Sequence, residues 1–372
     1  MIYLDYSATT PVNQEVLKSF NQTCEDYIGN PNSFHKLGVK SKELMDASTH
    51  QVATILGVKD TEVIYTSGSS ESNNMAIKGI ALKYANRGKK IISTFLEHPS
   101  VIGPLNYLSG LGYDIEFVNI KENGLVDMDH LKELLTDDTI LVSVGSVNSE
   151  VGLLQPIEEI GELLKSYPNC HFHVDMTQSI GKVNIPLTNI DLATFSAHKF
   201  YGIKGVGCLI KKEKVSVEPL IHGGKSTTVF RSGTPALPLI VSLSKALRLA
   251  YEDIETKYQN TLEINNYLRE CLSQFSKVVI NSNENSIPYV LNISVLGVRP
   301  ETFVHALEED EIYISSQTAC SDPNNKSRVV YTITNDEERA KSSLRISLSY
   351  LTTKEEIDKF LIVFKKCYEM LV

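Results

Sequence analysis

Short apolar runs alternate with longer amphipathic segments through the first two thirds of the chain. Seven runs rich in β-branched and aromatic residues predict strands, at Glu62–Thr66, Lys90–Phe95, Asp114–Val118, Thr139–Val144, His171–Asp175, Leu192–Ser196 and Val206–Ile210. Between them, segments such as Glu71–Ala85, Asp129–Leu135 and Pro156–Ser166 have the spacing of helices. Alternating strands and helices indicate βαβ units and a mainly parallel seven-stranded sheet flanked by helices on both faces. Ligands of such sheets bind beyond the carboxyl ends of the strands.

The pattern changes in the last third of the chain. A long helical stretch is predicted from Leu237 to Phe275, and the polar segment Ser321–Lys341 predicts a loop. The other predicted elements are strands at Val278–Asn281, Tyr289–Val295 and Leu344–Leu348 and helices at Glu301–Glu309 and Lys354–Leu371. This block is typical of a smaller α+β domain. We therefore expect a large domain over residues 12–250, and a small domain formed by residues 1–11 with 251–372.

Composition narrows the function classes. The chain has 372 residues, of which 42% are hydrophobic and 22% charged, as expected for a globular protein of two packed domains. A net charge of −9 makes nucleic acid a poor direct ligand. No run is long and apolar enough to cross a membrane. The start, MIYLDYSATTP, lacks the basic and apolar regions of a secretory signal, so we expect a cytoplasmic protein.

Cysteine usage points to at most one reactive thiol. The six cysteines are Cys24, Cys170, Cys208, Cys271, Cys320 and Cys367. No two have the spacing of a metal-binding or redox pair, and in a reducing compartment all six should be free thiols. No metal site is expected. Most of these side chains should pack as small hydrophobic groups, so the chemistry must single out one of them.

Several candidate catalytic residues follow predicted strands. Lys199 ends the run Ser196-Ala197-His198-Lys199, where it is either a solvated surface lysine or a group that binds an aldehyde covalently. Asp175 ends another apolar strand and could pair with a pyridinium nitrogen, the partner that pyridoxal phosphate requires. His98 could stack on a flat ring and move protons, or simply cap a loop.

The turn Thr66-Ser67-Gly68-Ser69-Ser70-Glu71 joins a predicted strand to a predicted helix. A helix N-terminus with free N–H groups suits a phosphate, although Ser69 or Ser70 could equally be an ordinary N-cap. The segment Arg231-Ser232-Gly233-Thr234 is a further candidate for phosphate binding.

An ordered set of motifs carries a family resemblance over nearly the whole chain. The motifs are YLDYSATTP (3–11), GNP (29–31), TSGSSESNN (66–74), EHPSV (97–101), HVDMTQSIGK (173–182), FSAHKFYGIKGVG (195–207), HGG (222–224), RSGT (231–234), SSQTAC (315–320) and SSLRISL (342–348). With them the chain resembles cysteine desulfurases of the NifS/IscS type, which are class V pyridoxal-phosphate enzymes of fold type I. The resemblance implies a homodimer that takes L-cysteine as substrate.

The resemblance also implies residue roles. Lys199 would hold pyridoxal 5'-phosphate, Asp175 would pair with its ring nitrogen, Gln178 would bind its ring hydroxyl, and His98 would stack on the ring and act as acid and base. The residues expected to contact the cofactor are Ser69, Ser70, His98, Asn148, Ser149, Asp175, Gln178, Ser196, His198, Lys199 and Thr234, the last from the other subunit. Arg345 would bind the substrate carboxylate with Asn30 nearby, and Cys320, on a loop, would be the nucleophile that receives the sulfur.

The implied reaction yields L-alanine and a persulfide on Cys320 that passes to an acceptor protein. The sequence departs from the family at Ser149, at Lys225-Ser226-Thr227, at Gln317-Thr318 and after Cys320. These departures leave the acceptor open between an iron–sulfur scaffold and a tRNA- or cofactor-thiolation enzyme. A selenocysteine lyase or another class V enzyme is the main alternative. The run Gly-Gly-Lys-Ser-Thr at 223–227 raises a nucleotide-binding switch as another, but it lacks the upstream glycine of a P-loop.

Overall fold

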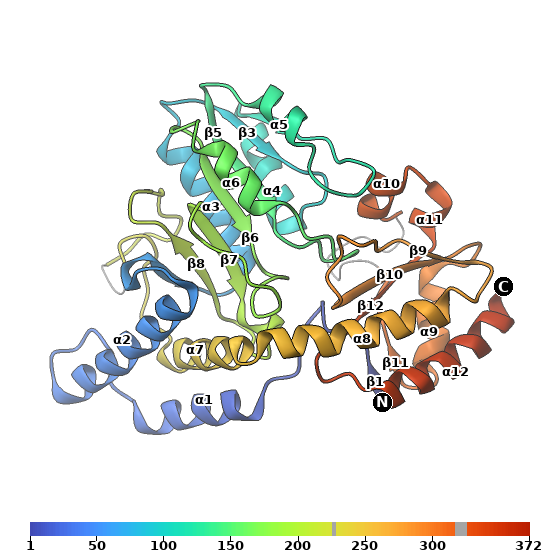
Figure 1. The fold of residues 1–372 in the computed structure, drawn as a ribbon. Helices are drawn as coiled ribbons and strands as arrows, with labels where there is room; N and C mark the ends of the chain where they lie inside the picture. Colours follow the sequence, from blue (N-terminus) through green and yellow to red (C-terminus); the bar gives the residue numbers. More distant parts are fainter. Residues whose placement is uncertain (225–227, 317–325) are drawn as a thin grey trace.

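A seven-stranded sheet forms the centre of the larger part of the molecule (Figure 1). The computed structural model describes residues 1–224, 228–316 and 326–372. The strand order is β2-β8-β7-β6-β5-β3-β4, and only β8 runs antiparallel to its neighbours. The strands are β2 (Val63–Thr66), β3 (Lys90–Ser93), β4 (Asp114–Phe117), β5 (Thr139–Gly145), β6 (His171–Asp175), β7 (Leu192–Ser196) and β8 (Gly207–Lys211). The mainly parallel sheet expected from the sequence is confirmed.

Helices cover both faces of this sheet. They are α1 (Gln14–Asp26), α2 (Lys36–Leu56), α3 (Ser69–Lys83), α4 (Pro99–Ser109), α5 (Met128–Leu134), α6 (Ile157–Leu164) and α7 (Leu237–Tyr251), with 3-10 turns at Asp60–Glu62 and Ala197–Lys199. The start of α4 is favoured by two residues of the sequence. The His98 side chain caps the helix by accepting from the Ser100 N–H, and Pro99 suits the first turn because it has no N–H group that would lack an acceptor there.

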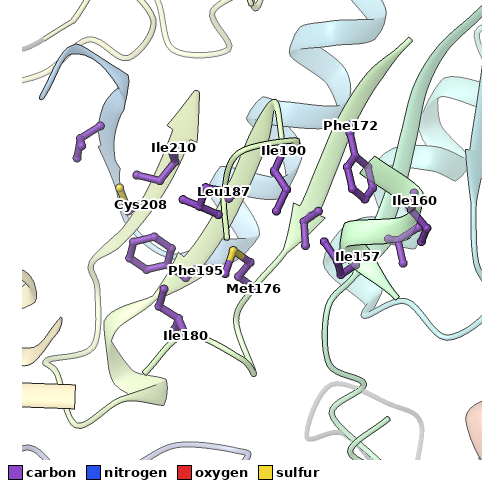
Figure 2. Close-up of a cluster of buried hydrophobic side chains, with 14 of the residues drawn as sticks. Ile157, Ile160, Phe172, Met176, Ile180, Leu187, Ile190, Phe195, Cys208 and Ile210 are labelled. Atoms are coloured by element: carbon purple, nitrogen blue, oxygen red, sulfur yellow. The ribbon is translucent and has the colours of Figure 1, made fainter. Parts of the chain in front are cut away.

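Neighbouring residues along the strands point into two different cores. Val142 and Phe172 face one core, in which Figure 2 shows Phe172 beside Ile157 and Ile160 of α6. Leu141 belongs to the other core, with side chains from α3 and α4. Since side chains of a strand alternate between its faces, a sheet covered on both sides needs apolar residues at nearly every position. This explains the continuous apolar runs in the sequence.

A second set of elements surrounds its own core. Strands β12 (Ser343–Ser347), β10 (Val290–Val295) and β9 (Val278–Ile280) form an antiparallel sheet, and β1 (Ile2–Tyr3) pairs in parallel with β11 (Ile312–Tyr313). The helices of this part are α8 (Ile254–Leu272), α9 (Pro300–Glu308), α10 (Arg328–Thr334), α11 (Glu337–Lys341) and α12 (Lys354–Leu371). Ile2 and Leu4 belong to this core, so the start of the chain packs with its end. The domain boundaries at 12 and 250 stay a prediction.

Two expectations need correction. The stretch from Leu237 to Phe275 is two helices rather than one, because Asp253 adopts a left-handed conformation with φ of 53°. The described part of Ser321–Lys341 is helical rather than a loop, since it holds α10 and α11. Its polar composition concealed Val329 and Val330, which are buried against Val151 and Leu153. Among the described residues, no helix is long and apolar enough to span a membrane.

Replacing Ile160 by alanine should lower the free energy of unfolding by about 2–5 kcal/mol, because a fully buried side chain in a packed core leaves a cavity. Urea denaturation followed by circular dichroism measures the effect. Ile362→Ala on α12 is the matched control, because Ile362 is 71% exposed and its removal should cost less than about 0.5 kcal/mol. Equal losses in both variants would contradict this account of the core.

Candidate functional site

A cavity of about 430 Å³ lies where the carboxyl ends of β2, β5, β6 and β7 meet. Its lining comes mostly from segments that follow these strands, with Ser7 and Ala8 from the N-terminus and Arg345 from β12. Ten of the residues proposed from the sequence line it, namely Ser69, Ser70, His98, Asn148, Ser149, Asp175, Gln178, Ser196, His198 and Lys199, and Arg345 is an eleventh.

Lys199 is held by the N-terminal segment. Its Nζ donates to the carbonyl oxygens of Ser7 at 2.6 Å and Ala8 at 2.9 Å. The N-terminal segment also contacts the chain just after Lys199, because the Tyr201 N–H donates to Thr10 Oγ1 at 2.8 Å. Tyr201 itself adopts a positive φ of 66°. The chain therefore turns sharply after Lys199, and the amino group stays at the cavity wall.

Asp175 presents a buried carboxylate with a donor on each oxygen. Oδ2 accepts from Asn73 Nδ2 at 2.8 Å, and Oδ1 accepts from the Thr177 N–H at 2.9 Å. Asp175 thus offers a fixed negative charge at the end of β6.

His98 caps α4 and lies in the same cavity. Its Nδ1 accepts from the Ser100 N–H at 3.1 Å. Burial lowers the pKa of His98, and the positive charges of Lys199 and Arg345 lower it further against the opposing effect of Asp175. The imidazole is therefore neutral near pH 7.

A polar cradle surrounds the N-terminus of α3. Ser196 Oγ accepts from the Ser69 N–H at 2.6 Å and donates to Ser69 Oγ at 3.0 Å. Gly207 allows the close approach of these segments, since a Cβ there would lie 2.6 Å from both Gly68 Cα and the Phe195 carbonyl oxygen. Free N–H groups at a helix N-terminus and nearby hydroxyls suit a phosphate. His198 borders the cradle, and burial lowers the pKa of His198 to about 4, so it is neutral.

Gln178 is oriented by a residue that the sequence did not single out. Its Oε1 accepts from Lys182 Nζ at 3.0 Å, and its Nε2 donates to the Ser7 carbonyl oxygen at 3.0 Å. Burial lowers the pKa of Lys182 to about 7, with Lys199 and Arg345 adding to the effect. The Gln178 amide is thus fixed with its NH₂ group on the Ser7 carbonyl oxygen, which also accepts from Lys199.

Arg345 is 1% exposed, although it borders the cavity. Nη2 donates to Asp5 Oδ1 at 2.8 Å and Nη1 donates to the Ser149 carbonyl oxygen at 3.2 Å. Its Nε has no hydrogen-bond partner among the described residues. A buried guanidinium with an unused donor is suited to binding a carboxylate.

Asn148 lines the cavity with its side chain already engaged. Its Nδ2 donates to the Leu96 carbonyl oxygen, and its Oδ1 accepts from the N–H groups of Glu150 and Val151. The side chain thus shapes the turn that carries Ser149. A cofactor contact by Asn148 stays a prediction.

Two predicted site residues that the structure describes, Asn30 and Thr234, do not line this cavity. Asn30 does not line it, and its Oδ1 accepts from the Asn32 N–H at 2.9 Å. Thr234 does not line it either, and its predicted contact with a partner subunit remains a prediction. Cys320 lies outside the described residues. The described residues contain no cluster of three His, Cys, Asp or Glu side chains able to hold a metal.

Sequence reasoning also missed Glu97. Its Oε1 accepts from Thr94 Oγ1 at 2.8 Å and from the Gly145 N–H at 2.9 Å, and its carbonyl oxygen accepts from Arg328 Nη2 at 2.9 Å. The start of α10 is thereby attached to the segment that carries His98. Adjacency to His98 was the only sequence signal for this residue.

Comparison with known proteins identifies the family that the chain resembles. A family model described as aminotransferase class-V matches residues 2–360. A cysteine desulfurase IscS of Dictyoglomus turgidum is 36% identical over 375 residues, covering 100% of this chain and 95% of the relative. A solved NifS-like protein superposes with a TM-score of 0.93 at 34% identity, covering 99% of this chain and 98% of that one. A solved structure of SspA in complex with cysteine has a TM-score of 0.83 at 30% identity, covering 95% and 100%.

Glu97 should make stability fall as pH rises. Burial raises the pKa of Glu97 from 4.5 to about 7. Between these values the folded protein keeps a proton that the unfolded chain releases, so stability present below pH 4.5 is lost towards pH 7. Relative to Glu97→Gln, the wild type should lose about 3 kcal/mol across this window, at about 1.36 kcal/mol per pKa unit.

Thermal and urea unfolding of both proteins at several pH values test this expectation. The exposed Glu263→Gln is the matched control and should follow the pH profile of the wild type. A constant difference between wild type and Glu97→Gln over the window would refute the assignment.

Proposed function

The chain belongs to the class V aminotransferase family, and we propose that it is a pyridoxal-phosphate-dependent cysteine desulfurase that converts L-cysteine to L-alanine and a persulfide on Cys320. The observation that carries the proposal is the convergence of Lys199, Asp175, His98 and Arg345 on one cavity. An amine, a fixed carboxylate, a neutral imidazole and a guanidinium are the groups required to bind this cofactor and an amino-acid carboxylate.

The residues around the cavity fit pyridoxal phosphate. Two buried polar side-chain atoms that border it, Thr177 Oγ1 and Arg345 Nε, have no partner among the described residues and so remain available to bound groups. In the proposed arrangement, Asp175 binds the ring nitrogen and Gln178 Nε2 the ring oxygen. The phosphate binds in the cradle of Ser69, Ser70, Ser196 and His198. When bound, the cofactor supplies an electron sink that stabilises negative charge at the substrate α carbon.

Lys199 is proposed to hold the cofactor and to move the substrate α proton. Its Nζ already lies at the cavity wall, where two backbone carbonyl oxygens orient it. The arrangement also brings the N-terminal segment into the site, because Ser7 accepts from both Lys199 and Gln178. The side chains of Lys199 and Gln178 thus donate to the same carbonyl oxygen, and an oriented amine favours proton transfer at one defined position.

Cys320 is proposed to take the sulfur as a thiolate. Its Sγ attacks the substrate sulfur, a sulfur–sulfur bond forms and the carbon–sulfur bond breaks. The electron pair of the broken bond remains with the carbon skeleton, which takes up protons and leaves as alanine. Electrons therefore balance without an external oxidant, and the persulfide carries the sulfur to an acceptor protein, either an iron–sulfur scaffold or a thiolation enzyme. A homodimer in which Thr234 reaches the partner's phosphate site is part of the proposal.

Replacing Cys320 by serine should abolish alanine and sulfide formation from L-cysteine while the protein still binds pyridoxal phosphate. The serine hydroxyl is a far weaker nucleophile, and cofactor binding does not use this residue. Alanine analysis and the visible absorbance of the purified protein measure the two properties. Cys24→Ser, at an exposed cysteine, is the matched control and should keep full activity. Full activity in Cys320→Ser would exclude this nucleophile.

Arg345→Lys should raise the KM for L-cysteine by about 10- to 100-fold, because lysine keeps the charge but loses the fork of donors, and a charged hydrogen bond contributes about 1.5–3 kcal/mol. Steady-state kinetics measure the change. Arg248→Lys on α7, outside the cavity, controls for the substitution itself. An unchanged KM would mean that the carboxylate binds elsewhere.

A further inference from the structure

A buried chain of hydrogen bonds joins the sheet to His98. Asn73 of α3 is its central member. Asn73 Nδ2 donates to Asp175 Oδ2 at 2.8 Å and to Ser100 Oγ at 2.9 Å, and Asn73 Oδ1 accepts from Thr194 Oγ1 at 2.5 Å. Ser100 Oγ lies 2.8 Å from His98 Nδ1. Three hydrogen bonds of one amide group thus connect β6, β7 and α4.

The direction of each bond can be derived from its partners. The ionised carboxylate of Asp175 only accepts, so the NH₂ group of Asn73 must face it, and the second hydrogen of that group goes to Ser100 Oγ. Ser100 therefore accepts from Asn73 and directs its own hydrogen to His98 Nδ1. The Ser100 backbone N–H, which can only donate, points to the same nitrogen at 3.1 Å. His98 Nδ1 accepts two hydrogen bonds and carries no proton.

The hydrogen bonds between Asn73 and Ser143, at the other end of this hydrogen-bond chain, also have defined directions. Thr194 uses its hydrogen for Asn73, so it accepts from His173 Nε2, which lies 3.3 Å away. His173 Nδ1 must then accept from Ser143 Oγ at 2.8 Å. Burial lowers the pKa of His173 to about 4, in agreement with a neutral ring. Every bond from Ser143 to His98 runs in one direction, and bonds aligned in this way polarise one another.

We propose that Asn73 is a positioning residue that holds His98 as a neutral imidazole protonated on Nε2, so that His98 serves the site as a hydrogen-bond donor. A second proton could enter His98 only at Nδ1, where it would break two hydrogen bonds. Lys199 moves the substrate α proton as proposed above, and His98 presents the Nε2–H to bound groups. This catalytic consequence rests on the proposed function, whereas the protonation state of His98 does not.

Nuclear magnetic resonance of the cofactor-free protein tests the protonation state directly. The nine histidines are labelled with ¹⁵N and ¹³C in a deuterated background, and His98→Gln identifies the His98 signals. The expected result is a proton on Nε2 and a hydrogen-bonded Nδ1. A proton on Nδ1 in the wild type would overturn the proposal.

Asn73→Asp tests the part played by the amide. Aspartate has nearly the same shape but no NH₂ group, so it accepts from Ser100 and draws the Ser100 hydrogen away from His98. The same substitution removes the donor to Asp175 and places a second carboxylate beside it. The His98 Nδ1 signal should shift towards that of a nitrogen with fewer hydrogen bonds. Asn74→Asp is the matched control on the same helix, because Asn74 Nδ2 donates to the Ser70 carbonyl oxygen instead, and it should leave the signal unchanged.

Variants of Ser100 test whether its hydroxyl connects Asn73 to His98. Ser100→Ala should shift the His98 signal in the same direction as Asn73→Asp, and Ser100→Thr, which keeps the hydroxyl, should retain the wild-type signal. A shift in Ser100→Ala but none in Asn73→Asp would show that Asn73 does not orient the hydroxyl and would overturn its assignment. In the cofactor-loaded enzyme, Asn73→Asp should lower kcat by roughly 100-fold with a smaller change in KM.

The protonation state of His98 and the proposed desulfurase function are tested by different measurements. If the wild-type signals are as expected but the loaded enzyme forms no alanine from L-cysteine, the hydrogen-bond chain stands and the proposed function is wrong. If alanine forms and the His98 proton is on Nδ1, the function stands and the inference is wrong.

Discussion

The buried carboxylate of Asp175 is the constraint on which the cavity depends. A charge inside a protein requires donors, and this one takes them from Asn73 on α3 and from the turn after β6. Meeting that requirement fixes α3 against the sheet. The fixed helix in turn places its N-terminus beside Ser196 and joins α4, with His98, to the same network. One charge thus links the end of β6, the N-terminus of α3 and the start of α4.

The N-terminal segment is the second link. Ile2 and Leu4 are anchored in the core that the end of the chain builds. Only a few residues later, Ser7 and Ala8 accept from Lys199, which follows β7 of the larger sheet. Asp5 lies between these anchors and pairs with Arg345 of β12. The lysine follows β7 and the arginine lies in β12, but one short stretch of chain positions both.

The sequence predicted most of the fold because sheet strands buried on both faces leave continuous apolar runs. It predicted the positions of Lys199 and Asp175 because both follow such runs. It failed where the decisive property is not local: Asp253 breaks a helical pattern through its backbone conformation, and Val329 and Val330 are buried only because Val151 and Leu153 meet them. Asn73 and Lys182 lie within helical or polar stretches, and nothing in their neighbours indicates which partners they meet across the fold.

Burial removes charge from several ionisable groups at the cavity or in contact with its lining. His98 and His198 are neutral near pH 7 because burial lowers the pKa of each, whereas Glu97 and Lys182, with pKa values of about 7, are each only partly charged there. Among the charged groups that line the cavity, Asp175, Lys199 and Arg345 are each oriented by specific hydrogen bonds, and Glu71 is paired with Arg231. A field set by few, fixed charges is already oriented before any ligand binds, so binding requires little rearrangement of the protein. In such a site a neutral donor at His98 can contact a charged ligand without competing with Lys199 for its proton.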